Sequence, residues 1–127
     1  MKVLIIAAHG SRKAESAREV AALTEKISLK SGACFDRVDH GFLQFSEPLL
    51  PGVIDDAVAL GATQIVIFPF FISAGSHILT DIPELVAESG KTYPGVEFTV
   101  TRHLGAAASV EDVILGEVNR HLGGGEG

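Results

Sequence analysis

Several residue types are scarce in this chain of 127 residues, and each scarcity excludes a class of protein. Cys34 is the one cysteine, so no disulfide can form within the chain, which fits a reducing compartment. Tryptophan is absent and 6% of the residues are aromatic, so aliphatic side chains must fill the core. Because 46% of the residues are hydrophobic and 20% are charged, the composition is that of a folded domain and not of a disordered chain.

Basic residues are also in the minority. The 10 Lys and Arg residues stand against 16 Asp and Glu residues, which gives a formal net charge of −6. Such a protein lacks the positive field of a general nucleic-acid binder, so we expect no nucleic-acid partner. The apolar run at residues 3–8 ends at His9 and is too short for a signal peptide or a membrane span. We therefore expect a cytoplasmic protein without a membrane partner.

Four common site motifs are missing. The chain has neither a Gly-x-Gly-x-x-Gly loop nor a Walker A loop, so nothing supports a nucleotide site, and we expect no organic cofactor. A Gly-x-Ser-x-Gly nucleophile elbow is absent as well. A phosphoreceiver domain would need paired aspartates after its first strand, where this chain has Ala8, His9 and Gly10.

The least ordinary stretch is residues 64–83, with the sequence QIVIFPFFISAGSHILTDIP. It begins with a continuous apolar run, which is typical of a strand buried on both faces of a parallel sheet. Pro69 has no N–H to donate and ends the strand. A loop of small residues leads to His77, and residues 80–84 predict the start of a helix. His77 thus follows the carboxyl end of a buried strand, where open α/β sheets bind ligands.

The rest of the chain alternates between strand and helix patterns. Strands are predicted at residues 3–8, 35–45, 64–68 and 96–100, and helices at 14–30, 46–60, 80–89 and 109–122. Ser46 is predicted to cap the second helix, with Glu47 and Pro48 in its first turn. Ser109 and Asp112 resemble a capping box at the start of the last helix, which carries one apolar stripe.

This alternation predicts the fold. Right-handed crossovers imply an α/β protein with a parallel four-stranded sheet between helical layers, a three-layer α/β/α arrangement. The two continuously apolar strands, first and third, should be central, which gives the strand order 2-1-3-4. We expect one domain over residues 1–123 and a flexible tail at 124–127.

Two histidines are then expected at one crevice. His9 follows the first strand and His77 the third, and these strands flank the switch point of the sheet. A lone histidine in a loop is usually structural, but two facing imidazoles can hold Co²⁺, Ni²⁺ or Fe²⁺ and can accept protons near neutral pH. Glu47 lies at the same edge, either as a third ligand or proton acceptor or simply as a favourable charge near a helix start.

A set of local cations is expected around this crevice. Arg12 and Lys13 follow His9, and Arg102 follows the fourth strand, so all three should lie at the carboxyl edge. In an acidic protein they suggest an anionic ligand. Further hydrogen-bond donors toward that ligand are expected from the serines and the backbone of the two loops, namely Ser11, Ser73, Gly75 and Ser76.

These segments resemble a known family, the small single-domain sirohydrochlorin chelatases of the short CbiX type. The similarity rests on residues 8–12 (AHGSR), residues 68–77 (FPFFISAGSH), Asp81-Ile82-Pro83 and Glu47-Pro48, and it extends over nearly the whole chain. It implies a chelatase-like fold and an enzyme, a lyase that inserts Co²⁺, or in relatives Ni²⁺ or Fe²⁺, into sirohydrochlorin during cobalamin or tetrapyrrole biosynthesis. It also implies that His9 and His77 bind the metal substrate, and that the protein forms a homodimer.

The chain departs from the family pattern after the fourth strand. There the family often has Leu-Gly followed by His-Pro, whereas here Leu104-Gly105 precedes three alanines and His103 comes before the pair. Two other functions stay open at this point. The same site would suit a carrier that binds metal or tetrapyrrole without catalysis. A phosphotransfer enzyme with His9 as nucleophile would need an arginine where Ala8 stands.

Overall fold

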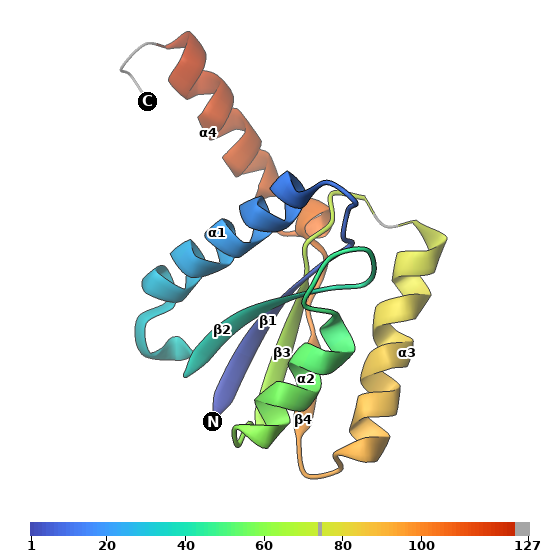
Figure 1. Ribbon diagram of the computed structural model, residues 1–127. Helices are drawn as coiled ribbons and strands as arrows, with labels where there is room; N and C mark the ends of the chain where they lie inside the picture. The colour runs from blue at the N-terminus through green and yellow to red at the C-terminus, as the bar shows by residue number, and fades with distance from the viewer. Residues whose placement is uncertain (74, 124–127) are drawn as a thin grey trace.

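A computed structural model describes residues 1–73 and 75–123, apart from the side chains of residues 76–79 (Figure 1). The predicted tail and Ala74 lie outside the described residues. Strands and helices alternate: β1 (Lys2–Ala8), α1 (Ala14–Ser31), β2 (Arg37–Phe42), α2 (Leu50–Ala59), β3 (Gln64–Pro69), α3 (Ser76–Thr92), β4 (Glu97–Val100) and α4 (Val110–Leu122). Two short 3-10 turns, η1 (Gly32–Cys34) and η2 (Leu104–Ala106), complete the described elements.

The four strands form one parallel sheet in the order β2-β1-β3-β4, as the sequence predicts. β1 pairs with β2 and β3 on either side, and Ala7 lies opposite Pro69 at the carboxyl end of the β1–β3 pair. β4 adds to the outer edge of β3. The switch point of the sheet therefore falls between β1 and β3, and the loops that follow these two strands leave the sheet side by side.

One face of the sheet is thoroughly covered. α2 and α3 pack against it and enclose a continuous apolar core (Figure 1). Side chains from three elements illustrate this, since Ile5 and Ile65 of the sheet and Ile54 of α2 are all 0% exposed. Burial of this much aliphatic surface supplies the main stabilisation of a chain without tryptophan or disulfides.

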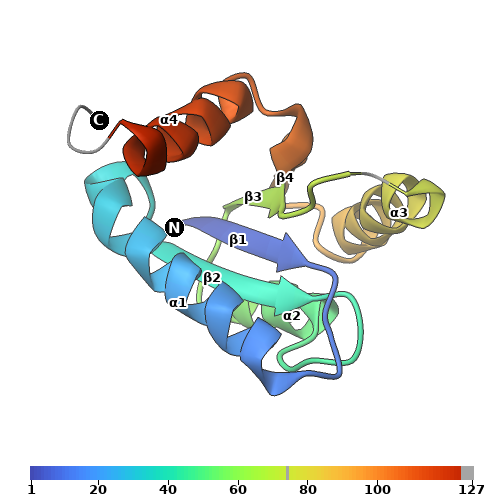
Figure 2. The same cartoon turned by 90° about the horizontal axis from the view of Figure 1, so that it is seen from above.

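The opposite face is covered by α1 over β2 and part of β1. Val20 of α1 packs there with Ala8 and Phe42 in a second, smaller cluster. Toward β3 this cover ends, so that Val66 and Phe68 are only partly buried. The prediction that β3 is buried on both faces is therefore wrong for this face, because α4 leaves the sheet and does not cover it (Figure 2).

The predicted start of α2 is wrong. The helix begins at Leu50 with Pro51 in its first turn, where a missing N–H costs nothing. Ser46 does not cap it, because its hydroxyl is engaged with the backbone of Ser11. Residues 43–49 instead form a loop whose end returns to β2, with the Phe42 N–H donating to the carbonyl of Pro48 at 2.9 Å.

Two further helix starts differ from expectation. α3 begins at Ser76 and continues through Pro83, so the predicted start near residue 80 is wrong. Pro83 lies inside the helix, directly after Ile82, which is 1% exposed and belongs to the core. α4 starts after Ser109 as predicted, but no side-chain capping bond forms there, and the Val113 N–H donates to the Ser109 carbonyl instead.

Candidate functional site at the carboxyl edge of the sheet

His9 stands at the carboxyl end of β1, directly after the last strand residue, and its side chain is exposed. Its ring meets the ring of Phe71 edge-on, with 6.3 Å between centroids and an interplanar angle of 87°. Phe71 follows β3 and is 8% exposed, so it belongs to the core. The imidazole thus rests on a fixed apolar support and still faces solvent, as a ligand-binding group must.

The turn after His9 is shaped by Gly10. This residue has φ +101°, and a Cβ atom there would lie 1.7 Å from the carbonyl oxygen of Gln44. The Gln44 N–H in turn donates to the His9 carbonyl at 3.1 Å. Only glycine fits both this backbone conformation and this close approach. The His-Gly pair is therefore what lets the loop after β2 lie directly against the loop after β1.

A second tie joins the same two loops through Ser11 and Ser46. The Ser46 hydroxyl donates to the Ser11 carbonyl at 2.8 Å and accepts from the Ser11 N–H at 3.1 Å. Ser46 is buried, so both backbone groups are satisfied away from water. The hydroxyl of Ser11 accepts from the Lys13 N–H at 3.1 Å, just before α1 begins. Ser11 thus holds the loop in place, beside any role toward a ligand.

Arg12 points toward an aromatic ring that sequence reasoning missed. Its guanidinium carbon lies 4.8 Å from the ring centroid of Phe45. Phe45 is 57% exposed and has φ +66°, a conformation that is unfavourable for a bulky side chain. A single phenylalanine within the polar stretch Gln44–Glu47 is the signal that could have drawn attention to it. The pair places a cation and an apolar surface together at the edge.

Glu47 lies in the same loop and is exposed. Its peptide bond to Pro48 is cis, and both residues precede the N-cap of α2, Leu49. The prediction that Glu47 lies in the first turn of a helix is therefore wrong, but the residue does lie in a loop at the carboxyl edge of the sheet. The Glu47 carboxylate takes no part in capping α2.

The loop after β3 carries the second group of predicted residues. Ser73 is exposed, and Gly75, also exposed, is the N-cap of α3. No described atom lies within 4 Å of a Cβ built on Gly75. His77 is the second residue of α3, but its side chain and that of Ser76 lie outside the described part of the structure. The pairing of His9 with His77 stays a prediction that the strand topology favours.

The loop after β4 meets the loop after β3 through Gly105. A Cβ on Gly105 would lie 1.6 Å from the Ile72 carbonyl oxygen, and the Gly105 N–H donates to the Phe71 carbonyl at 3.0 Å. Arg102 precedes this contact by three residues and is exposed at the predicted edge. Sequence reasoning assigned Arg102 to an anionic ligand but gave Leu104-Gly105 no role. The contact gives Leu104-Gly105 a structural role, because it fixes η2 beside the candidate site.

The apolar segment after β3 divides into three environments. Phe71 is core, Ile72 is 73% exposed, and Phe70 is partly buried beside α1. Ile72 alone of the three presents most of its side chain to solvent. Of these three residues, Ile72 therefore offers the largest exposed apolar surface at this edge.

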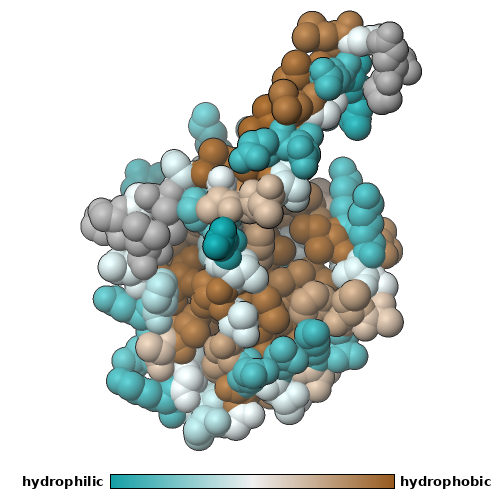
Figure 3. Space-filling view, turned by 180° about the vertical axis from the view of Figure 1, so that it is seen from behind, coloured by the Kyte–Doolittle hydropathy of each residue, from teal (hydrophilic) through white to brown (hydrophobic). Residues whose placement is uncertain are grey.

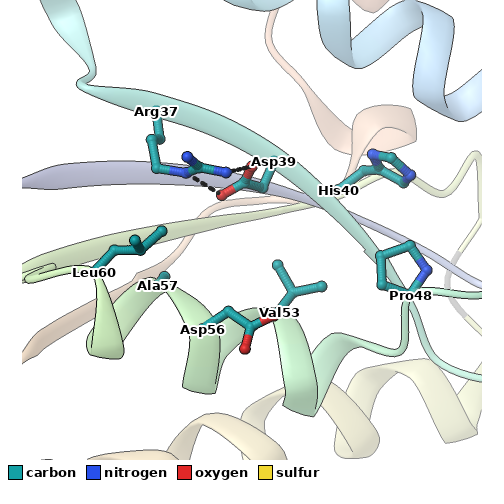
Figure 4. A pocket seen from close by; sticks show the side chains of 8 residues that line it. All are labelled: Arg37, Asp39, His40, Pro48, Val53, Asp56, Ala57 and Leu60. Carbon is teal, nitrogen blue, oxygen red and sulfur yellow. Dashed lines mark hydrogen bonds and ion pairs between the residues drawn. The ribbon is translucent and has the colours of Figure 1, made fainter.

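A separate group of titratable residues lies away from this edge, on β2 and α2. A cavity of about 180 Å³ runs between β2 and α2, where Arg37 and Asp39 form an ion pair at 2.9 Å (Figure 4). Burial lowers the pKa of His40, against a smaller opposing effect of Asp39. This cavity includes none of the predicted site residues. Within the described residues, no group of three or more His, Cys, Asp and Glu side chains gathers as a metal site, and no helix is long and apolar enough to cross a membrane.

Comparison with known proteins shows which sequences share these features. Over 124 residues the chain is 31% identical to the chloroplast sirohydrochlorin ferrochelatase of Arabidopsis thaliana, and this alignment covers 98% of this chain and 54% of the relative. Over 86 residues it is 37% identical to the sirohydrochlorin cobaltochelatase of Methanococcus aeolicus, and this alignment covers 68% of this chain and 59% of the relative. The chain thus spans little more than half the length of these relatives.

Solved structures share the fold. A CbiX protein from Marinobacter aquaeolei superposes with a TM-score of 0.79 at 22% identity over 97% of this chain and 98% of that one. The cobalt complex of the sirohydrochlorin chelatase SirB from Bacillus subtilis subspecies spizizenii gives a TM-score of 0.79 at 24% identity, over 93% of this chain and 50% of that one. The model of the CbiX family matches residues 3–121, and this chain accordingly belongs to the CbiX family.

Proposed function

We propose that this protein is a sirohydrochlorin chelatase that inserts a divalent metal ion into sirohydrochlorin. One observation carries the proposal: the segments AHGSR and FPFFISAGSH, the longer and more specific of the two, follow β1 and β3, adjacent parallel strands whose carboxyl ends lie in register. Membership of the CbiX family and the names of the relatives support the same reaction. Among metals we favour Co²⁺, with Ni²⁺ or Fe²⁺ as alternatives, since relatives carry both cobaltochelatase and ferrochelatase names.

In this proposal His9 and His77 hold the metal ion. Two imidazoles leave most coordination positions open, so the ion is held loosely enough to pass to the macrocycle. The exposed His9 on its Phe71 support suits this role, because the metal substrate must arrive from solvent and leave with the product. Metal insertion displaces the two pyrrole N–H protons of the macrocycle, so the reaction also needs bases.

Histidine can accept those protons near neutral pH, and Glu47 is the further acceptor that we assign. Because the Glu47 carboxylate is exposed in the loop after β2, it is available to a ligand at the rim. Charge is balanced overall, since one divalent cation enters as two protons leave. A histidine nitrogen that holds the metal cannot accept a proton at the same time, so a histidine accepts a pyrrole proton only as it gives up the metal, and Glu47 is the acceptor that is available before then.

The substrate is a flat macrocycle with many carboxylates, and the edge offers groups that suit it. Arg12 and Arg102 are exposed at this edge and would pair with carboxylates, each such charged hydrogen bond contributing about 1.5–3 kcal/mol when shielded from water. Ser11, Ser73, Gly75 and Ser76 would add hydrogen-bond donors from the loops after β1 and β3. The open surroundings of Gly75 suit close approach of a ring to the backbone.

The test is an absorbance assay of sirohydrochlorin with Co²⁺, Ni²⁺ or Fe²⁺, with and without the protein. We expect catalysed metal insertion by the wild type and a loss of at least about a hundredfold in His77→Ala, the range that general base catalysis alone contributes. His121→Ala, at an exposed position of α4, is the matched control and should retain activity. Wild-type rates in a folded His77→Ala protein would refute the assignment.

The same assay separates an enzyme from a carrier. A carrier would shift the absorbance spectrum of the tetrapyrrole in proportion to the protein added, without turnover. An enzyme at catalytic concentration converts all of the substrate.

A further inference from the structure

His9 is held by two different loops, by one through its backbone and by the other through its side chain. The Gln44 N–H, in the loop after β2, donates to the His9 carbonyl at 3.1 Å. The imidazole itself meets the ring of Phe71, in the segment after β3, with 6.3 Å between the ring centroids. The orientation of the imidazole therefore depends on a residue that follows a different strand.

The support of the His9 imidazole differs from the one that metal-binding histidines usually have. Such a histidine donates its second ring N–H to a carboxylate or a carbonyl, which orients the ring and makes it a stronger ligand. Among the residues that the structure describes, no hydrogen bond or ion pair reaches a ring nitrogen of His9. By contrast, Nδ1 of His121 lies 3.0 Å from the carbonyl oxygen of Glu117. For His9, the contact with Phe71 takes the place of such a polar support.

Phe71 is held firmly enough to orient another side chain. It is 8% exposed and belongs to the core cluster that α2 and α3 enclose. Its N–H donates to the Pro69 carbonyl at 3.1 Å, and its carbonyl accepts from the Gly105 N–H at 3.0 Å. Because the backbone and the ring of Phe71 are both fixed, contact with this ring limits the orientations that the His9 imidazole can adopt.

The other apolar residues near this point do not offer the same support. Phe68 and Phe70 are only partly buried, and Ile72 is 73% exposed. Seen from behind, the molecule shows apolar surface open to solvent below the projecting α4 (Figure 3). An apolar side chain that faces solvent has more freedom to move than one enclosed in the core. Among these residues, Phe71 is therefore the one suited to fix the position of His9.

We infer that Phe71 is a positioning residue for metal binding by His9, and that the loop after β4 takes part through it. A Cβ on Gly105 would clash with the carbonyl oxygen of Ile72, so the two loops are in direct contact, and moving one moves the Phe71 backbone. An aromatic support orients the imidazole without the added ligand strength that a carboxylate gives, which suits a site that must pass its ion on. The proposed metal-binding role of His9 underlies this inference.

The first test is a calorimetric titration with Co²⁺ in the absence of sirohydrochlorin. Phe71→Leu should bind Co²⁺ about two- to tenfold more weakly, the effect of having to order one more side chain on binding. Phe71→Tyr keeps the ring and should bind like the wild type. Phe98→Leu makes the same truncation at a partly buried position of β4 that packs on the same core, and it is the matched control.

The ring-proton chemical shifts of His9, measured by NMR, give a readout that a loss of stability alone would not move. They should change in Phe71→Leu, which removes the ring current, and stay as they are in Phe98→Leu. Wild-type Co²⁺ affinity in folded Phe71→Leu, or a loss of the same size in Phe71→Tyr or Phe98→Leu, would overturn the inference.

The second test concerns the loop after β4. Gly105→Ala should weaken Co²⁺ binding by a similar factor, and Phe71→Leu/Gly105→Ala should bind no more weakly than Phe71→Leu, because both changes act through the same ring. Gly116→Ala in α4 is the control, since no described atom outside the helix backbone lies within 4 Å of a Cβ there. Additive losses, or wild-type affinity in Gly105→Ala, would show that the loop does not act through Phe71.

His9→Ala separates this inference from the proposed function. If His9→Ala binds Co²⁺ like the wild type, the metal-binding role of His9 fails, and the role of Phe71 fails with it. If His9→Ala loses affinity for Co²⁺ and Phe71→Leu does not, only the role of Phe71 fails. If both variants lose affinity but the wild type does not catalyse metal insertion into sirohydrochlorin, the role of Phe71 stands and the chelatase assignment fails.

Discussion

The guanidinium carbon of Arg12 lies 4.8 Å from the ring centroid of Phe45, so a cation from the loop after β1 stacks on an aromatic ring from the loop after β2. Phe45 occupies φ +66°, and this conformation of a non-glycine residue is stabilised from outside, because the loop is tied to its neighbour at Gln44 and Ser46. A strained, exposed aromatic residue at a candidate site suggests a functional role for its ring.

We therefore predict that Phe45→Gly is more stable than Phe45→Ala and binds sirohydrochlorin more weakly than the wild type. Relative to Phe45→Ala, the glycine variant should unfold at higher urea, by roughly 1 kcal/mol in unfolding free energy, because glycine adopts positive φ without a Cβ penalty. Both variants should bind sirohydrochlorin roughly two- to fivefold more weakly, the effect of losing about 0.5–1 kcal/mol of cation–π and ring contact. If Phe45→Ala binds like the wild type, the ring has no role toward the ligand.

Gly10 allows a prediction with a matched control inside the same chain. Gly10 and Gly61 have nearly the same φ, +101° and +106°, but a Cβ on Gly10 would clash with Gln44, whereas no atom of the described residues lies within 4 Å of one on Gly61. Gly61→Ala should cost about 1–2 kcal/mol for the backbone conformation alone. Gly10→Ala should cost more than that, because the loops after β1 and β2 must also move apart. Equal losses in urea unfolding would show that the close approach to Gln44 is unimportant.

Much of the fold could be predicted from the sequence alone. The strand order and the alternation of strands and helices followed from the apolar runs and their spacing, since each run is long enough to be recognised as a strand or a helix. The carboxyl-edge positions of His9, Arg12 and Arg102 then followed from topology.

What the sequence did not reveal depends on contacts between distant loops. The approach of Gly105 to Ile72 and the hydrogen bonds between Ser46 and Ser11 join residues more than 30 positions apart, and neither pair has a local signature. Ser46 illustrates the error that results. As a serine before Glu47 and Pro48 it has the local pattern of a helix cap, but a tertiary contact claims its hydroxyl. The apolar stripe of α4 was likewise visible in the sequence, but not its exposure within the part of the chain that the structure describes.

Gly75 tests whether a macrocycle approaches the backbone after β3. Gly75→Val should lower the unfolding free energy by no more than about 1 kcal/mol, the usual cost of an apolar residue at an N-cap, because Gly75 has an ordinary negative φ and no described atom near its Cβ position. It should weaken sirohydrochlorin binding, measured by absorbance titration, by about tenfold, since a steric cost of about 1.4 kcal/mol corresponds to that factor. Unchanged affinity in the folded variant would remove Gly75 from the substrate site.

His40 should make stability depend on pH. It is half-buried, its ring meets that of Phe42 edge-on at 5.5 Å, and burial lowers its pKa below the usual 6.5 despite the nearby Asp39. Between the folded and the unfolded pKa the unfolded chain binds more protons, so the free energy of unfolding rises with pH in that window. The stability is complete above about pH 6.5 and is lost as the pH falls.

Urea unfolding at a series of pH values from about 5 to 7.5 measures this dependence. His40→Gln should flatten it, because the titrating group is gone, even if the variant is less stable at every pH through lost packing on Phe42. His121→Gln, at an exposed position on α4, should leave the pH dependence as it is in the wild type. A His40→Gln profile with the wild-type slope would assign the dependence to another group.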